Sequence, residues 1–385
     1  MLFDAFRRTD TGAHYLAGRV VDGRYWWLRV GLFTGLLAFV VNTPSFEYGP
    51  ADVLTTLRGQ IEAPFTPQEH LPDSHASKRE LRLTMPLLGH VLGLELWHLF
   101  VLLFVSGFVL LSLVALLTDQ VFGDRTTAFF FAAGLACAPP GSACFTDMVG
   151  YFDGIAHLLL LLAMWTRAWP IVGLCVLAAA FTDERGAVAI GFVFLWWVYR
   201  AVEATDAKER GAAYGRAAAA VVGALLYGGL RLWVQNQYGL STPVGKGALV
   251  GLGVWGEYRQ WIPLGLLSGL EAFWILIGVS MWALYRRQRL WFLVMFGGMV
   301  VVQSAVAASV TDYTRSAAYL LPALLVALLS LRDAMTTRER RLFFLGLVLS
   351  CLLLPTVNMI SSVPFWRGPL PLRMADWAMQ LWAMV

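Results

Sequence analysis

The stretch from Asp147 to His157 carries two carboxylates and a histidine, and it leads directly into the apolar run Leu158–Trp165. Charged groups at the mouth of a membrane helix are costly unless they face water, protein or a ligand. Asp153 and His157 are four residues apart, so on a helix they share a face and could hydrogen-bond. Asp147 precedes that helix and could serve as the acidic group at its N-terminus. The pattern allows two interpretations, a helix cap with an internal Asp–His pair or a general-base carboxylate.

Two further charged junctions interrupt apolar segments. Asp183, Glu184 and Arg185 fall in one tight turn, and Asp312 and Arg315 stand three residues apart in another break. A solvated hairpin and a self-neutralising ion pair would account for both without any ligand. Arginine also matches phosphate geometry well, so either arginine could bind a phosphate or an anionic lipid head group. The neighbouring acids could then orient the arginine or hold a divalent cation, Mg²⁺ or Mn²⁺.

The composition indicates a polytopic membrane protein. Of 385 residues, 58% are hydrophobic and only 14% are charged, which is too apolar for a soluble globular protein. The net charge of +4 does not indicate a nucleic-acid partner, because membrane proteins collect Lys and Arg in cytoplasmic loops. The four cysteines show no metal-ligand spacing. Cys137 and Cys144 flank a Pro-Pro-Gly turn and are either a disulfide or, as we favour, small buried thiols.

We expect an all-α fold with about eleven transmembrane helices, forming a single transmembrane domain over residues 1–385, because each helix needs roughly 17–25 mostly apolar residues. The candidate spans are Tyr25–Val41, Leu96–Leu117, Thr126–Ala138, Tyr151–Trp165, Trp169–Phe181, Gly186–Val198, Ala212–Val234, Ile262–Tyr285, Leu290–Val310, Ser316–Leu331 and Leu342–Val357. Those between Thr126 and Val198 are short for a full hydrocarbon core. Short helices of this kind usually pack against others and line a cavity or a thinned region.

The positive-inside rule predicts the orientation of these spans. Short basic segments, among them Arg286–Arg289 and Arg338–Arg341, fall on one side together with residues 1–24, which we expect to be a cytoplasmic N-terminal segment. Residues 42–95 then form the first exoplasmic loop, and residues 358–385 form an exoplasmic C-terminal segment. The charged junctions all lie on this outer side. The basic loops and the lack of a cleavable signal favour a multi-pass protein of the bacterial inner membrane.

The first exoplasmic loop is the longest hydrophilic segment and holds candidate residues of its own. Glu47 and Asp52 are the acids nearest to the first span, and Leu81–Leu94 predicts a surface or re-entrant helix. The basic run Lys78–Arg82 precedes that helix. It is either the solvated face of an amphipathic helix or a basic entrance for a phosphate-linked lipid.

This layout resembles the GT-C superfamily of integral membrane glycosyltransferases. The shared features are about eleven spans, a long first outer loop with acids and a surface helix, an acidic second outer loop at Asp147 and Asp153, and a charged junction at residues 182–185. The resemblance implies transfer of a sugar from a polyprenyl-phosphate donor to a lipid, glycan or protein at the outer face, in the cell envelope. It also implies a carboxylate of the first loop as the base.

The chain departs from the family in one respect. The usual paired acids directly after the first span are absent, since Asn42 is followed by Thr-Pro-Ser-Phe-Glu47. The resemblance therefore implies that the base is Glu47 or Asp52, or that it has moved. The catalytic candidates are Glu47, Asp52, Asp147 and Asp153. The candidates for substrate binding are Arg82, His157, Asp183, Glu184, Arg185, Asp312 and Arg315, of which the arginines would hold the donor phosphate.

Glycosyl transfer from a lipid-linked donor is the leading functional prediction, with membrane lipids around the site and a divalent cation as an optional cofactor. The second is a transporter or lipid flippase in which Glu271 and Arg231 act as gating charges, since intramembrane carboxylates are functional candidates. The third is a non-catalytic membrane assembly subunit whose protein partners the sequence does not identify. No P-loop, GxGxxG or HExxH motif is present, which argues against an ATP-driven pump or a membrane zinc protease.

Overall fold

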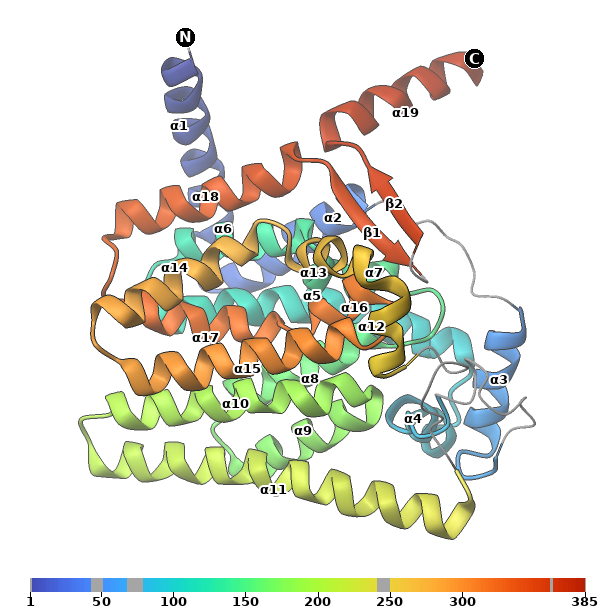
Figure 1. Cartoon of the computed structure of the whole chain (residues 1–385). Helices are drawn as coiled ribbons and strands as arrows, with labels where there is room; N and C mark the ends of the chain where they lie inside the picture. The colour runs from blue at the N-terminus through green and yellow to red at the C-terminus, as the bar shows by residue number, and fades with distance from the viewer. Residues whose placement is uncertain (1, 43–50, 68–78, 241–249, 361–362, 385) are drawn as a thin grey trace.

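The computed structural model describes residues 2–42, 51–67, 79–240, 250–360 and 363–384. Over these ranges the chain is almost entirely helical, with one short β-hairpin near the C-terminus (Figure 1). The helices are α1 (Leu2–Val21), α2 (Trp26–Asn42), α3 (Ala51–Glu62), α4 (Thr84–Leu92), α5 (Leu96–Phe122), α6 (Arg125–Cys137), α7 (Pro139–Thr146), α8 (Asp153–Trp165), α9 (Trp169–Thr182), α10 (Glu184–Glu203), α11 (Ala207–Tyr238), α12 (Leu252–Tyr258), the 3₁₀ turn η2 (Arg259–Trp261), α13 (Ile262–Leu270), α14 (Phe273–Arg286), α15 (Leu290–Ala308), α16 (Tyr313–Ala318), α17 (Leu321–Leu331), α18 (Thr337–Leu353) and α19 (Leu370–Met384).

Within the described residues, five helical segments are long and apolar enough to cross a membrane: α5, α10, α11, α15 and the continuous α16–α17 segment. The number rises to seven if each of two bent pairs is one span, α6 with α7 at 59° and α13 with α14 at 84°. The helices α2, α8 and α9 are apolar but shorter. These features fit a multi-pass membrane protein, whereas eleven full spans are not confirmed. A helix of 13 or 14 residues, such as α8 or α9, is only about 20 Å long, against a hydrocarbon core of about 30 Å.

The centre of the bundle is α17, an apolar helix whose residues are all buried. Pro322 lies in its first turn, where a missing N–H costs nothing. Helices α14, α10, α5 and α8 pack around it. At the rim, α11 lies across α9 and α10 (Figure 1) and exposes large apolar side chains such as Leu225, Leu232 and Trp233. An exposed apolar face of this kind suits contact with lipid.

The described part of the first loop consists of α3, α4 and residues 63–67 and 79–83, which lie between them in the sequence. The Gln60 amide donates to the carbonyls of Arg79 and Glu80, each at 3.0 Å. The Thr84 hydroxyl donates to the carbonyl of Ala178 at 2.7 Å, which attaches the loop to the end of α9. The helix predicted in the second half of the loop is present as α4. Helix α3 was not predicted.

The C-terminal segment adds a hairpin at the same end of the bundle as α3 and α4. Strand β1 (Thr356–Ile360) pairs antiparallel with β2 (Val363–Arg367), and β1 packs against α13 and α16 (Figure 1). Val357 of β1 lies in one apolar cluster with Tyr313 of α16. The predicted end of the last span, Val357, is therefore wrong, because α18 ends at Leu353 and the chain turns into a strand.

The four cysteines are free and buried. The Cys144 thiol lies 3.4 Å from the hydroxyl of Ser106 on α5. The alternative of a disulfide between Cys137 and Cys144 is therefore wrong, and the interpretation as small buried thiols is confirmed.

Candidate functional site

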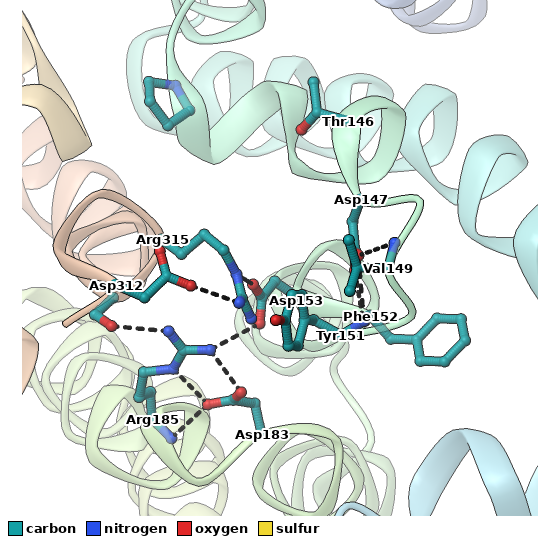
Figure 2. A network of polar contacts seen from close by, with 12 residues as sticks. Thr146, Asp147, Val149, Tyr151, Phe152, Asp153, Asp183, Arg185, Asp312 and Arg315 are labelled. Carbon is teal, nitrogen blue, oxygen red and sulfur yellow. Dashed lines mark hydrogen bonds and ion pairs between the residues drawn. The ribbon is translucent and has the colours of Figure 1, made fainter. Parts of the chain in front are cut away.

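Charged side chains from four segments meet in one cluster, and Figure 2 shows the part of it that runs from Asp183 to Asp312. The segments are the loop before α4, the start of α8, the junction of α9 with α10, and α16. Ion pairs join these side chains in an alternating order, which we call the ion-pair chain: Glu184, Arg82, Asp183, Arg185, Asp153, Arg315 and Asp312. The structure thus brings together junctions that lie far apart in the sequence.

Asp183 is the anion at the α9–α10 junction, and its side chain is completely buried. It caps α10 by accepting from the backbone N–H of Arg185 at 2.9 Å, and it accepts twice from the Arg185 guanidinium at 2.7 Å. Arg82 Nη1 lies 2.9 Å from the same carboxylate, and Arg82 binds both oxygens of Glu184 at 3.2 and 3.1 Å. Burial raises the pKa of Asp183, but the charges of Arg185 and Arg82 outweigh burial and lower it. Asp183 is therefore an ionised anchor for the loop that carries Arg82.

Asp153, the first residue of α8, joins two arginines of different helices (Figure 2). Its Oδ1 accepts from Arg185 Nη2 at 3.2 Å and from the Tyr319 hydroxyl at 2.9 Å. Its Oδ2 accepts from Arg315 Nε at 2.5 Å. A general base needs a lone pair directed at the substrate proton. The geometry therefore favours Asp153 as a buried counterion and does not favour it as the base.

His157 follows one turn later and is completely buried. Its ring packs against Tyr319 with the two centroids 4.8 Å apart, and it forms no hydrogen bond with Asp153. The predicted Asp153–His157 pair is therefore wrong. The physical reason is that stronger, charged donors already occupy the carboxylate.

Asp147 organises the turn that leads into α8. Its carboxylate accepts from four consecutive backbone N–H groups, those of Val149, Gly150, Tyr151 and Phe152, at 3.2, 3.1, 3.2 and 2.5 Å (Figure 2). Phe152 has a φ of 59°, in the left-handed region that costs a non-glycine residue about 1–2 kcal/mol. The carboxylate offsets this strain. The interpretation of Asp147 as the acidic group before the helix fits this geometry.

The guanidinium groups of the buried Arg79 and the partly buried Arg315 stack on the ring of Tyr151, and we call these two residues the guanidinium pair. Their central carbons lie 4.3 and 3.4 Å from the ring centroid. Within the described part of the chain, Nε and Nη2 of Arg79 and Nη2 of Arg315 are buried without a hydrogen-bond partner. Burial lowers the pKa of Arg79, and the charges of Arg82 and Arg315 act in the same direction, whereas Tyr151 and Asp147 oppose the shift. Among the described residues, no anion accepts a hydrogen bond from these nitrogens.

A narrow cavity adjoins the guanidinium pair. Its lining includes Gln60, Arg79, Arg82, Met85 and Tyr151. Arg79 was part of the basic run noted in the sequence but was not singled out. Nothing in the sequence indicated that the ring of Tyr151 would contact the guanidinium groups of Arg79 and Arg315.

Helix α16 holds Arg315 in place through close packing on α13. A Cβ added at Gly265 would lie 2.3 Å from the Cβ of Tyr313, and one added at Gly269 would lie 2.3 Å from the Cβ of Ala317. The hydroxyls of Ser268 and Thr314 are 2.7 Å apart across the same contact. The spacing of small residues four apart lets two helices approach this closely.

Several predictions are not tested by this geometry. Glu47 lies outside the described residues, and Asp52 lies in α3 but its side chain is not described. Both remain predictions. Among the residues described, no group of three or more His, Cys, Asp or Glu side chains could hold a metal ion. The aspartates of the site accept from arginines or backbone N–H groups, and the divalent cation stays a prediction.

The two charges of the transporter hypothesis lie in separate surroundings. Glu271 stands at the sharp break between α13 and α14 with a φ of 51°. Its carboxylate interacts electrostatically with Cys137, Cys351 and Arg373. Arg231 donates to the hydroxyl of Tyr227 at 2.6 Å on α11. The geometry gives no sign that they act as one gating pair.

Comparison with known proteins identifies no relative: no protein-family model, no curated protein and no solved structure matches the chain. The function is therefore inferred from the chemistry of the site.

Proposed function

We propose that this protein is a membrane glycosyltransferase that takes a sugar from a polyprenyl-phosphate donor and transfers it to an acceptor at the outer face of the inner membrane. The observation that carries the proposal is the guanidinium pair, Arg79 and Arg315, whose buried N–H groups find no acceptor among the residues that the structure describes. A phosphate supplies negative charge and several acceptor oxygens, and its hydrogen bonds to arginine are among the strongest in proteins. The pair lies at the end of an apolar bundle, which suits a phosphate carried by a membrane lipid.

In the proposed reaction, an acceptor hydroxyl attacks the anomeric carbon of the donor sugar. The sugar–phosphate bond breaks, its electron pair leaves with the phosphate oxygen, and the hydroxyl proton passes to a carboxylate. The guanidinium pair stabilises the negative charge on the departing phosphate, the role of oriented positive groups at developing charge. The base comes from the first loop, Glu47 or Asp52, because the described aspartates of the site are already engaged.

The test is a transfer assay with the purified protein and labelled polyprenyl-phosphate sugars. We expect transfer by the wild type, and a large loss of kcat in Glu47→Gln or Asp52→Asn, whichever removes the base. General-base catalysis typically contributes about 10²- to 10⁴-fold. No transfer with any donor, together with an unchanged set of cell-surface glycans in a deletion strain, would contradict the proposal.

A non-catalytic assembly subunit is the second candidate. It is favoured by one observation, that Asp147, Asp153 and Asp183 already accept from arginines or backbone N–H groups. In that case Glu47→Gln and Asp52→Asn leave the transfer activity of the assembly intact. Arg185→Ala, which breaks the ion-pair chain, would instead reduce the yield of the intact complex.

A further inference from the structure

A second charged region lies at the opposite end of the bundle, where a cavity of about 740 Å³ opens between the ends of α5, α8, α10 and α17 and the start of α11. Helix α10 links the two regions, since it carries Arg185 at its start and Arg200 near its end. Fifteen helical residues separate these two positions by roughly 22 Å. In Figure 1 this end is the one at which α10 turns into α11, away from α3 and α4.

Arg167, Arg200 and Arg216 are three of the four arginines that line this cavity. The guanidinium carbons of Arg216 and Arg200 lie 4.6 and 5.6 Å from the centroid of the Trp197 ring. The Trp197 indole is itself fixed, because its N–H donates to the carbonyl of Ala163 at 2.9 Å. The cations are therefore held close together on a buried aromatic surface.

None of these three arginines has a carboxylate within 4.0 Å in the described part of the chain. Four acids line the cavity. Glu209 acts electrostatically on Arg200 and Arg216 from beyond ion-pair distance, and the other three have other partners. Glu203 pairs with Arg289, Asp333 pairs with Arg287 at 3.4 Å, and Asp206 caps α11. Like charges at close range repel one another, and here the charges of Arg167 and Arg216 act directly on Arg200. An anion in the cavity would relieve this repulsion.

Membrane topology alone does not explain the arrangement. The positive-inside rule requires basic residues at one end of the bundle, and exposed ones such as Arg286 and Arg338 meet that requirement. It does not require that three arginines converge in a cavity with no carboxylate of the described residues within ion-pair distance of them. The positive-inside rule therefore leaves the clustering of these arginines unexplained.

We infer that this cavity binds the phosphate group of a lipid head group or of a small soluble phosphate compound. The planar guanidinium fork matches phosphate oxygens in pairs, and two arginines held on one indole provide several such donors. The volume falls within the range of about 300–1,000 Å³ typical of small-molecule sites, which leaves room for an organic group beside the phosphate. Trp165 and Trp197 line that space. This inference does not depend on glycosyl transfer at the other end.

The test measures binding to the full-length protein, purified in detergent, by titration calorimetry with two probes. One probe is short-chain phosphatidylglycerol and the other is inorganic pyrophosphate. We expect the wild type to bind at least one of them, and Arg200→Gln combined with Arg216→Gln to weaken that binding by tenfold or more. Binding of the lipid alone identifies a head-group site, and binding of pyrophosphate identifies a site for soluble phosphates.

Two further variants keep the test decisive if the double variant does not fold. Ala212→Glu leaves both arginines in place and adds a carboxylate at an exposed position that lines the cavity, so it should weaken binding equally. Arg338→Gln removes one positive charge at an exposed position outside the cavity and should bind as the wild type does. Wild-type binding of neither probe, or unchanged binding in Ala212→Glu, would overturn the inference.

Discussion

One carboxylate, Asp153, connects two arginines that belong to different helices of the membrane bundle. Arg185 comes from α10 and Arg315 from α16, and Tyr319 adds a third donor. In surroundings that exclude water, a guanidinium left without its anion is far more costly than it is at a protein surface. The ion-pair chain therefore fixes the positions of the side chains next to the candidate phosphate site.

Asp153→Asn tests this role. The substitution keeps the size of the side chain but leaves the buried Arg185 and the partly buried Arg315 without their shared, buried anion, so we expect a loss of about 3–5 kcal/mol of stability. Asp312→Asn is the matched control, because Asp312 pairs with the same Arg315 at 2.6 Å but is partly exposed. Its cost should be below about 1 kcal/mol. Thermal unfolding in detergent measures both, and equal losses would contradict a special role for Asp153.

Asp183 predicts a specific dependence on pH. Its pKa is lower in the folded protein than in the unfolded chain, so its stabilising contribution is complete above the ordinary aspartate value of about 3.9. The contribution is lost as the pH falls through the lower, folded value. We expect the unfolding temperature to drop below about pH 4, and to drop less steeply in Asp183→Asn. The exposed Asp333→Asn should follow the wild type, and an identical pH profile for Asp183→Asn would refute the assignment.

At the residue scale, the sequence singled out every member of the ion-pair chain as a candidate residue, because charged residues at the ends of apolar segments are few. It did not predict that these residues pair with one another across segments. It could not identify the guanidinium pair. The stacking of Arg79 and Arg315 on Tyr151 joins three segments that only the tertiary fold brings together. Helical spacing alone predicted a hydrogen bond between Asp153 and His157. In the structure, Arg185 and Arg315 bind that carboxylate instead.

At the scale of elements, the contact of α13 with α16 determines where Arg315 lies. Gly265→Ala places a methyl group 2.3 Å from the Cβ of Tyr313, so the two helices must separate. We expect a loss of about 1–3 kcal/mol of stability, the usual cost of overpacking. Gly278→Ala in α14 meets open space and should have little effect. Comparable stability of the two variants in thermal unfolding would show that this close contact is unimportant.

The sequence predicted most helices but not how they break. One span was expected over Ile262–Tyr285, whereas the chain bends by 84° at Glu271. Hydropathy does not reveal this break, because it depends on a non-glycine residue with positive φ. The hairpin of β1 and β2 was missed for a similar reason. Its stability depends on packing against α13 and α16, which a local pattern does not contain.

At the scale of the whole molecule, the two ends of the bundle carry different charged regions. The ion-pair chain and the first loop lie at one end, and the arginine-lined cavity lies at the other. The basic loops predict that the ion-pair chain faces outward and the cavity faces the cytoplasm.

Cysteine labelling tests this orientation, because the four native cysteines are buried. Arg58→Cys places a thiol at an exposed position of α3, and Arg338→Cys places one at an exposed position of α18. In intact cells, a membrane-impermeant maleimide should label the first variant and not the second. Labelling in the reverse pattern would move the candidate site to the cytoplasmic side.

The central claim is that the guanidinium pair binds the phosphate of a lipid-linked sugar donor. Its most direct test is the rate of sugar transfer as a function of donor concentration for Arg79→Gln, beside Arg58→Gln as an exposed control in the same loop. A lost hydrogen bond to a charged group costs about 1.5–3 kcal/mol, so the KM for the donor should rise about 10- to 100-fold in Arg79→Gln. Arg58→Gln should keep the wild-type KM. An unchanged KM in Arg79→Gln, in an assay where the wild type transfers sugar, would contradict the claim.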